Sequence, residues 1–75
     1  MNKFYDVLKG LEGKSVLIRL RNGLEARGKA VMIDPPTMNV LLNDADLTNA
    51  DGFALGHYGV LIIRGDQVSL LAPLS

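Results

Sequence analysis

The sequence contains no cysteine and no tryptophan, and it has a single histidine. Without cysteine no disulfide can form, and one histidine is too few to hold a structural metal ion. A chain of 75 residues buries only about 60% of the surface that it exposes when unfolded. Small domains usually add disulfides, metal or oligomerisation to such a core, so we expect self-association. The lack of cysteine also fits a reducing compartment, and we expect a cytoplasmic protein with no cofactor.

Long apolar runs and an excess of one charge are also absent. No run approaches the roughly 20 residues that cross a bilayer, and the N-terminus lacks the pattern of a secretion signal, so we expect no membrane association. Eight basic and eight acidic residues give a net charge of zero, with +3 over residues 1–40 and −3 over residues 41–75. Nucleic-acid binders usually show a stronger basic excess. Such a role would therefore need a local cluster or charges repeated by symmetry.

Hydrophobic periodicity predicts one domain over residues 1–75, with a short helix followed by five strands. Phe4, Val7, Leu8 and Leu11 have the spacing of a helix face, and Asn2 is a suitable N-cap. The expected bounds are about 2–11 for the helix and about 15–21, 24–33, 38–43, 58–63 and 67–72 for the strands. An all-β pattern without helices between the strands indicates a barrel. We therefore expect a mainly β fold, a five-stranded, strongly bent antiparallel barrel of the SH3-like type.

Turn residues divide these strands. Asn22-Gly23 predicts a hairpin with a type I′ turn, in which both residues have positive φ. Gly28 predicts a bend or bulge within its strand. The polar, glycine-containing stretch 43–57 predicts a loop or hairpin extension in which His57 is a loop residue, and Pro73 is expected to end the last strand.

Two of the expected strands, 58–63 and 67–72, are apolar on both faces. Their apolar residues are Val60, Leu61, Ile62, Ile63, Leu70 and Leu71. Strands of this kind need cover on both faces, and bare strand edges favour aggregation. The sequence predicts that another copy of the chain supplies the cover.

Motifs for catalysis are incomplete. The segment 13–15 (Gly-Lys-Ser) resembles the end of a P-loop, but the required earlier glycine is replaced by Leu8, and a helix precedes the segment where a strand is needed. Three aspartates within residues 44–51 invite a calcium interpretation, yet the EF-hand positions for glycine and glutamate hold Asn49 and Leu55. A lone histidine without a strained nucleophile turn does not indicate a hydrolase. We expect no enzyme, no catalytic residue and no metal site.

Polar groups gather in the stretch Asp34-Pro35-Pro36-Thr37-Met38-Asn39, here called the hinge. Two consecutive prolines exclude a strand interior, so the hinge joins two strands. In a five-stranded antiparallel barrel it can lie at the same end as Arg64-Gly65-Asp66, here called the Arg64 turn. Asn39 offers an amide that can donate and accept at a base edge. Arg64 offers a planar cation for stacking on a base or pairing with phosphate.

The Arg64 turn completes a predicted pocket for an unstacked base of single-stranded RNA. Gly65 permits positive φ, and Asp66 can brace the turn by bonding to the backbone. Simpler interpretations stay open at this point. Asn39 can be satisfied locally at a strand end, Arg64 can form a surface or intersubunit salt bridge, and we expect Met38 to pack in the core.

The sequence resembles the Sm-like (LSm) family, above all its single-domain archaeal members, over nearly its whole length. The segments that resemble the Sm1 motif are Asp6-Val7-Leu8, Gly13-Lys14-Ser15-Val16, Arg19-Leu20-Arg21-Asn22-Gly23, Gly28, Asp34, Met38-Asn39 and Leu42. Ile63-Arg64-Gly65-Asp66 resembles the Sm2 motif. The bacterial branch, which has a Lys-His pair in this turn, fits less well.

The resemblance implies a homo-oligomeric ring, with a heptamer expected, in which the fourth strand of one copy pairs with the fifth strand of the next. It also implies binding of U-rich single-stranded RNA and a scaffold or chaperone role in RNA processing. By this resemblance Asn39 reads the uracil edge, Arg64 covers the base and Asp34 orients Asn39. Gly65 and Asp66 would shape the wall of the pocket.

The hinge departs from the family pattern. Three residues, where the family has two, separate Asp34 from the Met-Asn pair, and Thr37 occupies the place of a stacking histidine or aromatic residue. A stack of about 1–3 kcal/mol per base is thereby lost, and Pro36 offers a weaker apolar surface. We therefore expect a reduced affinity for uridine. The alternatives are a ring-forming assembly protein with weakened or lost uridine recognition, and a monomeric SH3-like adaptor.

Overall fold

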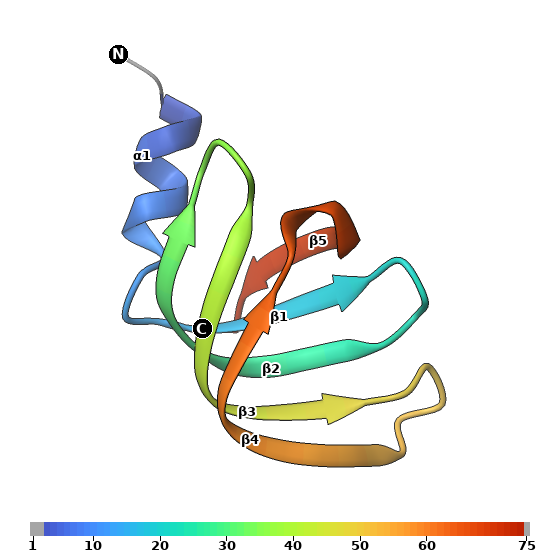
Figure 1. Cartoon of the computed structure of the whole chain (residues 1–75). Helices are drawn as coiled ribbons and strands as arrows, with labels where there is room; N and C mark the ends of the chain where they lie inside the picture. The colour runs from blue at the N-terminus through green and yellow to red at the C-terminus, as the bar shows by residue number, and fades with distance from the viewer. Residues whose placement is uncertain (1–2, 75) are drawn as a thin grey trace.

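The computed structural model describes residues 3–74, which form one helix and five strands (Figure 1). The elements are α1 (Lys3–Gly10), β1 (Ser15–Leu20), β2 (Glu25–Asp34), β3 (Asn39–Thr48), β4 (Ala54–Ile63), a 3-10 turn (Gly65–Gln67) and β5 (Val68–Pro73). The strands pair in antiparallel fashion in the order β4-β3-β2-β1-β5. The predicted mainly β fold, a short helix before a bent five-stranded sheet, is confirmed. The expected N-cap, Asn2, lies outside the described residues.

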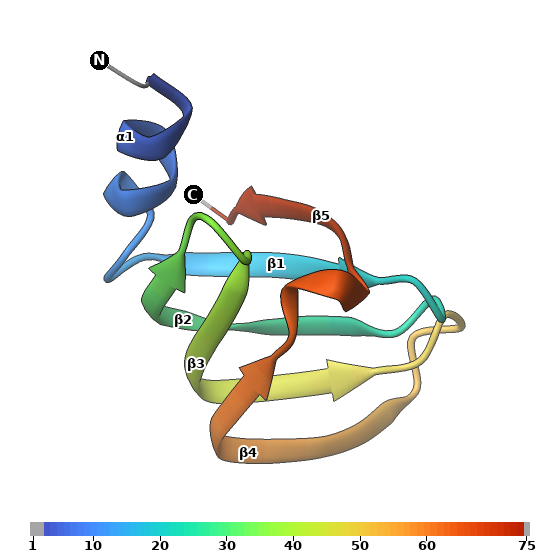
Figure 2. The same ribbon diagram turned by 45° about the horizontal axis from the view of Figure 1, so that its top comes forward.

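Two bulges on opposite strands bend the sheet between β2 and β3 (Figure 2). At the first, β3 carries an extra residue beside Gly28, and Asp44 there adopts a φ of 51°. A Cβ atom on Gly28 would lie 3.0 Å from the Cα of Ala45, so the close approach of β3 favours glycine. The bend predicted at Gly28 is confirmed. At the second bulge the extra residue is on β2, between Ala30 and Met32.

The core lies inside the bend. Ten apolar side chains are buried there: Leu8, Val16, Ile18, Ala26, Ala30, Ile33, Val40, Leu42, Ala45 and Ile63. On α1 only the inner part of the apolar stripe meets this core, because Phe4 and Val7 remain 72% and 65% exposed. The helix therefore presents an uncovered apolar surface.

The outer strands β4 and β5 do not pair with each other within residues 3–74, and both are edges of the sheet. Val60 and Ile62 on β4 are 62% and 70% exposed, and Leu70 on β5 is exposed as well. Both faces of these strands are therefore apolar, as predicted. Pro73 is the last residue of β5, so the strand ends there as expected, and an edge strand tolerates the proline.

Strands β3 and β4 are ten residues long, so most of the stretch 43–57 forms the hairpin extension that the sequence allowed. Two local predictions were wrong. His57 lies within β4 and not in a loop. Gly23 has a φ of 86°, but Asn22 does not have positive φ. The amide of Gly23 donates to the carbonyl of Leu20, which gives a three-residue loop in place of a type I′ turn.

Candidate nucleic-acid interface

The hinge and the Arg64 turn meet at one end of the sheet, as the sequence predicted. The Oδ1 atom of Asn39 accepts a hydrogen bond of 2.8 Å from the backbone N–H of Gly65, which lies 26 residues away in the chain. This bond fixes the orientation of the Asn39 amide. The exposed side chain then offers the two hydrogens of Nδ2 and the second lone pair of Oδ1 to a ligand.

Gly65 is required by contact with the hinge. A Cβ atom at this position would lie 1.7 Å from the carbonyl oxygen of Thr37 and 2.7 Å from the carbonyl carbon of Met38. No side chain fits in that space. Gly65 does not have the positive φ that the sequence interpretation gave it, whereas Met38 does, with a φ of 60°. Met38 packs against the core, as expected.

Asp34 organises the hinge through Thr37. The Thr37 hydroxyl donates to Oδ2 of Asp34 at 2.5 Å and accepts from the backbone N–H of Asn39 at 3.1 Å. The carbonyl oxygen of Asp34 also accepts from the backbone N–H groups of Thr37 and Met38, at 3.2 and 2.6 Å. Both hydrogen bonds of the Thr37 hydroxyl are therefore made within the hinge, and this hydroxyl links Asp34 to the backbone of Asn39.

Arg64 and Asp66 form an exposed ion pair on the Arg64 turn. Nη2 of Arg64 lies 3.1 Å from Oδ2 of Asp66, and the two side chains are 79% and 55% exposed. Asp66 therefore pairs with the guanidinium, where the sequence interpretation had it bond to the backbone. Exposed pairs of this kind contribute only about 0–1 kcal/mol. Arg64 can consequently leave Asp66 to meet a base or a phosphate at little cost.

A shallow apolar hollow of about 200 Å³ adjoins Asn39. Its lining residues are Met32, Asp34, Asn39, Val40, Leu41 and Ile62. Sequence reasoning did not single out Met32, although it precedes the hinge and its side chain is 57% exposed. The uninterrupted apolar run at residues 30–33 gave no signal of which side chain is exposed.

Sequence reasoning also missed Lys9 and Glu12, which contact β2 directly before the hinge. The Glu12 carboxylate accepts from the backbone N–H of Ile33 at 2.9 Å and from Nζ of Lys9 at 2.8 Å. These bonds, that from Lys9 above all, lower the pKa of Glu12, and the same pairing raises the pKa of Lys9. Their spacing of three residues was a weak signal for a pair on one helix face.

Comparison with protein families gives one matching domain. The sequence profile of the LSM domain matches residues 6–73. A Thermococcus kodakarensis protein described as snRNP Sm-like is 42% identical over 69 residues, which cover 92% of this chain and 88% of the relative.

Solved structures of similar proteins have the same fold. The Sm protein of Pyrococcus abyssii, solved in complex with a uridine heptamer, superposes with a TM-score of 0.83 at 38% identity, covering 92% of this chain and 94% of that one. A heptameric Sm-type protein of P. aerophilum superposes with a TM-score of 0.87 at 31% identity, covering 100% and 97% of the two chains.

Proposed function

This chain belongs to the LSM (Sm-like) domain family, as its sequence resemblance predicted, and on that premise we propose that it forms a homo-oligomeric ring that binds single-stranded U-rich RNA. The relatives with known structure include a heptamer and a complex with a uridine heptamer. A ring of seven copies and a role as scaffold or chaperone in RNA processing are part of this proposal.

The hydrogen bond from Gly65 to Asn39 is the observation that carries RNA recognition. It orients the exposed Asn39 amide and leaves the Nδ2 hydrogens and one lone pair of Oδ1 for a base. Uracil presents the acceptor O4 beside the donor N3–H, whereas cytosine presents a donating amino group beside the acceptor N3. An amide that donates to O4 and accepts from N3–H therefore favours uracil at this position. Arg64 can cover the base or contact a phosphate once it leaves Asp66.

Two exposed apolar surfaces, one at the β4 edge and one beside the β5 edge, support the ring because neighbouring copies could cover them. On one side β4 is an uncovered edge with exposed Val60 and Ile62. On the other side an apolar groove of about 460 Å³ runs between α1 and the second edge, β5. Its lining residues are Phe4, Val7, Leu8, Leu11, Met38, Gly65, Val68, Ser69, Leu70, Leu71 and Pro73. Pairing β4 of one copy with β5 of the next would cover both edges.

We expect the hinge to bind uridine with lower affinity than a hinge that carries an aromatic residue at the position of Thr37. Thr37 has no ring to stack on a base, and its hydroxyl is held by Asp34. Pro36 is exposed and offers a smaller apolar face. A ring with lost uridine recognition is therefore the second candidate function, favoured by this one observation.

No catalytic role belongs to the proposal, because the family's site is built for binding. A cytoplasmic location is part of the proposal and rests on the lack of cysteine. Within residues 3–74, no helix has the length and hydropathy needed to cross a membrane.

Size-exclusion chromatography with light scattering tests the ring. We expect a single oligomer with several copies of the chain. Val60→Asp places a charge on the β4 edge that ring formation would cover, so it should shift the protein toward smaller species. Val31→Asp is the control, because it makes the same substitution at an exposed residue of β2, which pairs with neither β4 nor β5. A monomeric wild-type protein would favour the SH3-like adaptor and contradict both ring functions.

Fluorescence anisotropy with labelled oligo-U and oligo-A separates RNA binding from lost recognition. We expect binding at micromolar concentration or below, with a preference for oligo-U and an affinity that falls as salt is added, because phosphate contacts release counterions. Equal and negligible affinity for both oligomers at low salt would favour the assembly protein without uridine recognition.

A further inference from the structure

Strand β2 extends past its neighbour β1 on the way to the hinge. The β1–β2 pairing reaches only to Ser15 opposite Lys29. One residue further, Ala30 still exchanges backbone hydrogen bonds with the segment before β1, since its N–H donates to Lys14 and its carbonyl accepts from Gly13. From residue 31 to the hinge, β2 has β3 on one side and, within the described part of the chain, no strand on the other.

Two charged side chains occupy the place of the missing strand. The backbone N–H of Ile33 donates to Oε2 of Glu12 at 2.9 Å, and the carbonyl oxygen of Ile33 accepts from Nζ of Lys9 at 3.3 Å. Lys9 and Glu12 are also bonded to each other, at 2.8 Å. The helix and the segment after it thus hold both backbone groups of one residue, across 21 and 24 positions of sequence. We call this arrangement the Ile33 clamp.

The Ile33 clamp lies directly before the hinge. Ile33 is followed by Asp34, which bonds Thr37, and Thr37 accepts from the N–H of Asn39. Asn39 in turn accepts from Gly65. An unbroken series of covalent and hydrogen bonds therefore links α1 to the amide that faces the ligand. We propose that Glu12, assisted by Lys9, is a positioning residue that fixes the backbone at the start of the hinge and thereby the Asn39 amide; its effect on RNA rests on the proposed function.

Apolar packing holds α1 without the Ile33 clamp. Leu8 is buried in the core and Leu11 packs against it, whereas the side chains of Lys9 and Glu12 are 36% and 26% exposed. Removing the carboxylate leaves these apolar contacts in place and leaves the N–H of Ile33 without its acceptor. A buried or half-buried donor without a partner destabilises its surroundings. The effect of the change should therefore be local, at the hinge.

The test combines three variants of the full chain with two measurements. Glu12→Ala removes the acceptor, and Glu12→Gln keeps an oxygen acceptor without the charge. Glu25→Ala is the matched control, because Glu25 also accepts charged hydrogen bonds, from Arg19 and Arg27, but touches neither α1 nor the hinge.

The first measurement is amide hydrogen exchange by NMR without RNA. The N–H of Gly65 reports directly on its bond to Asn39. In Glu12→Ala it should exchange about tenfold faster than in the wild type, which corresponds to the loss of one hydrogen bond. Glu12→Gln should restore most of the protection, and Glu25→Ala should leave it unchanged.

The second measurement is anisotropy with oligo-U. Glu12→Ala should weaken binding roughly three- to tenfold through the misplaced Asn39 amide, with Glu12→Gln close to the wild type. Unchanged Gly65 exchange in Glu12→Ala would overturn the positioning role. Failure of the wild type to bind oligo-U would refute the proposed function, while the exchange data would still decide the Ile33 clamp. Should Glu12→Ala fail to fold, Lys9→Met, which removes the second bond to Ile33, must show the faster exchange; wild-type exchange in it would equally overturn the role.

Discussion

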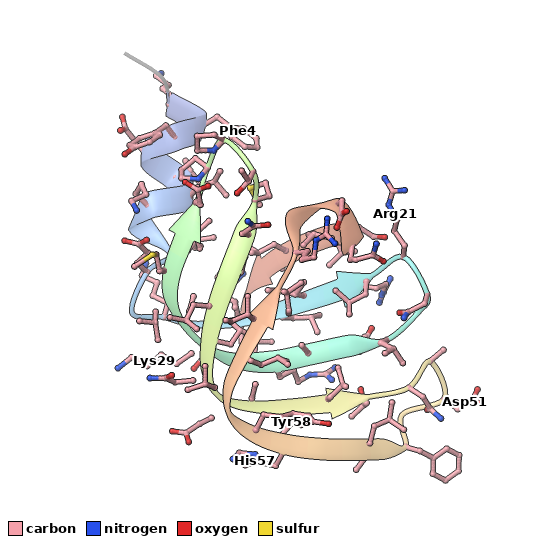
Figure 3. All side chains as sticks on the ribbon, in the orientation of Figure 1. Phe4, Arg21, Lys29, Asp51, His57 and Tyr58 are labelled. Carbon is pink, nitrogen blue, oxygen red and sulfur yellow. The ribbon has the colours of Figure 1, made fainter. Side chains whose placement is uncertain are left out.

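An asparagine lies at each end of β3. Both side chains accept hydrogen bonds from backbone N–H groups, but over very different distances in the sequence. After the strand, Oδ1 of Asn49 accepts from the backbone N–H groups of Asp51 and Phe53, both at 2.9 Å. At its start, Oδ1 of Asn39 accepts from Gly65, 26 residues away. The tip of the β3–β4 hairpin, where Figure 3 labels Asp51, therefore closes on itself, whereas the hinge depends on a distant turn.

This difference separates a structural turn from a candidate binding site. At the hairpin tip every side-chain bond spans four residues or fewer, so its geometry is set locally. At the hinge, bonds from α1 and from the Arg64 turn converge on a few residues. A site held from several directions keeps its amide pointing to solvent in one orientation, which recognition of a base edge requires. Disturbing either end should show this contrast.

Gly65→Ala is expected to have the largest effect. Its Cβ would overlap the Thr37 carbonyl, so the hinge and the Arg64 turn must separate, with a loss of about 1–3 kcal/mol or more in the free energy of unfolding and loss of oligo-U binding. Chemical denaturation and anisotropy measure both. Gly52→Ala at the hairpin tip is the control: it has open space and a φ of 88°, so it should cost about 1–2 kcal/mol and leave RNA binding unchanged. A fully active Gly65→Ala would contradict the described contact.

Thr37→Val should have an intermediate effect. The change keeps the side-chain volume but removes the hydroxyl that links Asp34 to the N–H of Asn39. We expect a loss of about 1–2 kcal/mol in stability together with weaker oligo-U binding. Thr48→Val at the other end of β3 removes a hydroxyl without a described partner and should change neither. If both variants behaved alike, the hinge network would have no special role.

The smallest effect is the pH dependence that Glu12 contributes. Its pKa is lowered from the ordinary value of 4.5, chiefly by the bond from Lys9. A carboxyl with a lowered folded-state pKa stabilises the protein above the unfolded pKa and loses that contribution as pH falls through the folded value. The pKa of Lys9 is raised above 10.5, so Lys9 stays charged over this range.

Thermal unfolding of the wild type and of Glu12→Gln measures this dependence. The stability difference between the two proteins should be present at pH 6–7 and shrink toward zero as the pH falls well below about 4.5. Glu25 also has a lowered pKa, chiefly through Arg19, so Glu25→Gln should show a similar loss of stability difference. A constant difference between wild type and Glu12→Gln at every pH would argue against a charged Ile33 clamp.

The sequence was sufficient to predict the features that follow a short hydrophobic period or that depend on proline and glycine. The helix spacing of Leu8 and Leu11, the bend at Gly28 and the apolar edges of β4 and β5 were all predicted. The meeting of the hinge with the Arg64 turn also followed, because antiparallel connections of a five-stranded barrel alternate between its ends.

The features that were missed depend on contacts between distant residues. The alternation in β3 is broken by Asp44, whose positive φ marks a bulge, so the sequence left both a loop and a hairpin extension open for residues 43–57 and placed His57 in a loop. Gly65 was assigned a positive φ because its need for space next to Thr37 is visible only in three dimensions. The Ile33 clamp joins side chains to a backbone 21 and 24 positions away, and no local pattern encodes such bonds.

Recognition of the base by the Asn39 amide can be decided by one comparison of affinities. Oligo-U and oligo-C differ at the position where an amide donor discriminates. Wild type and Asn49→Ala should both prefer oligo-U over oligo-C, since Asn49 only closes the hairpin tip. Asn39→Ala should lose most of this preference, a change of about tenfold or more in the affinity ratio for one specific hydrogen bond. An Asn39→Ala ring that keeps the wild-type ratio would show that the base is read elsewhere.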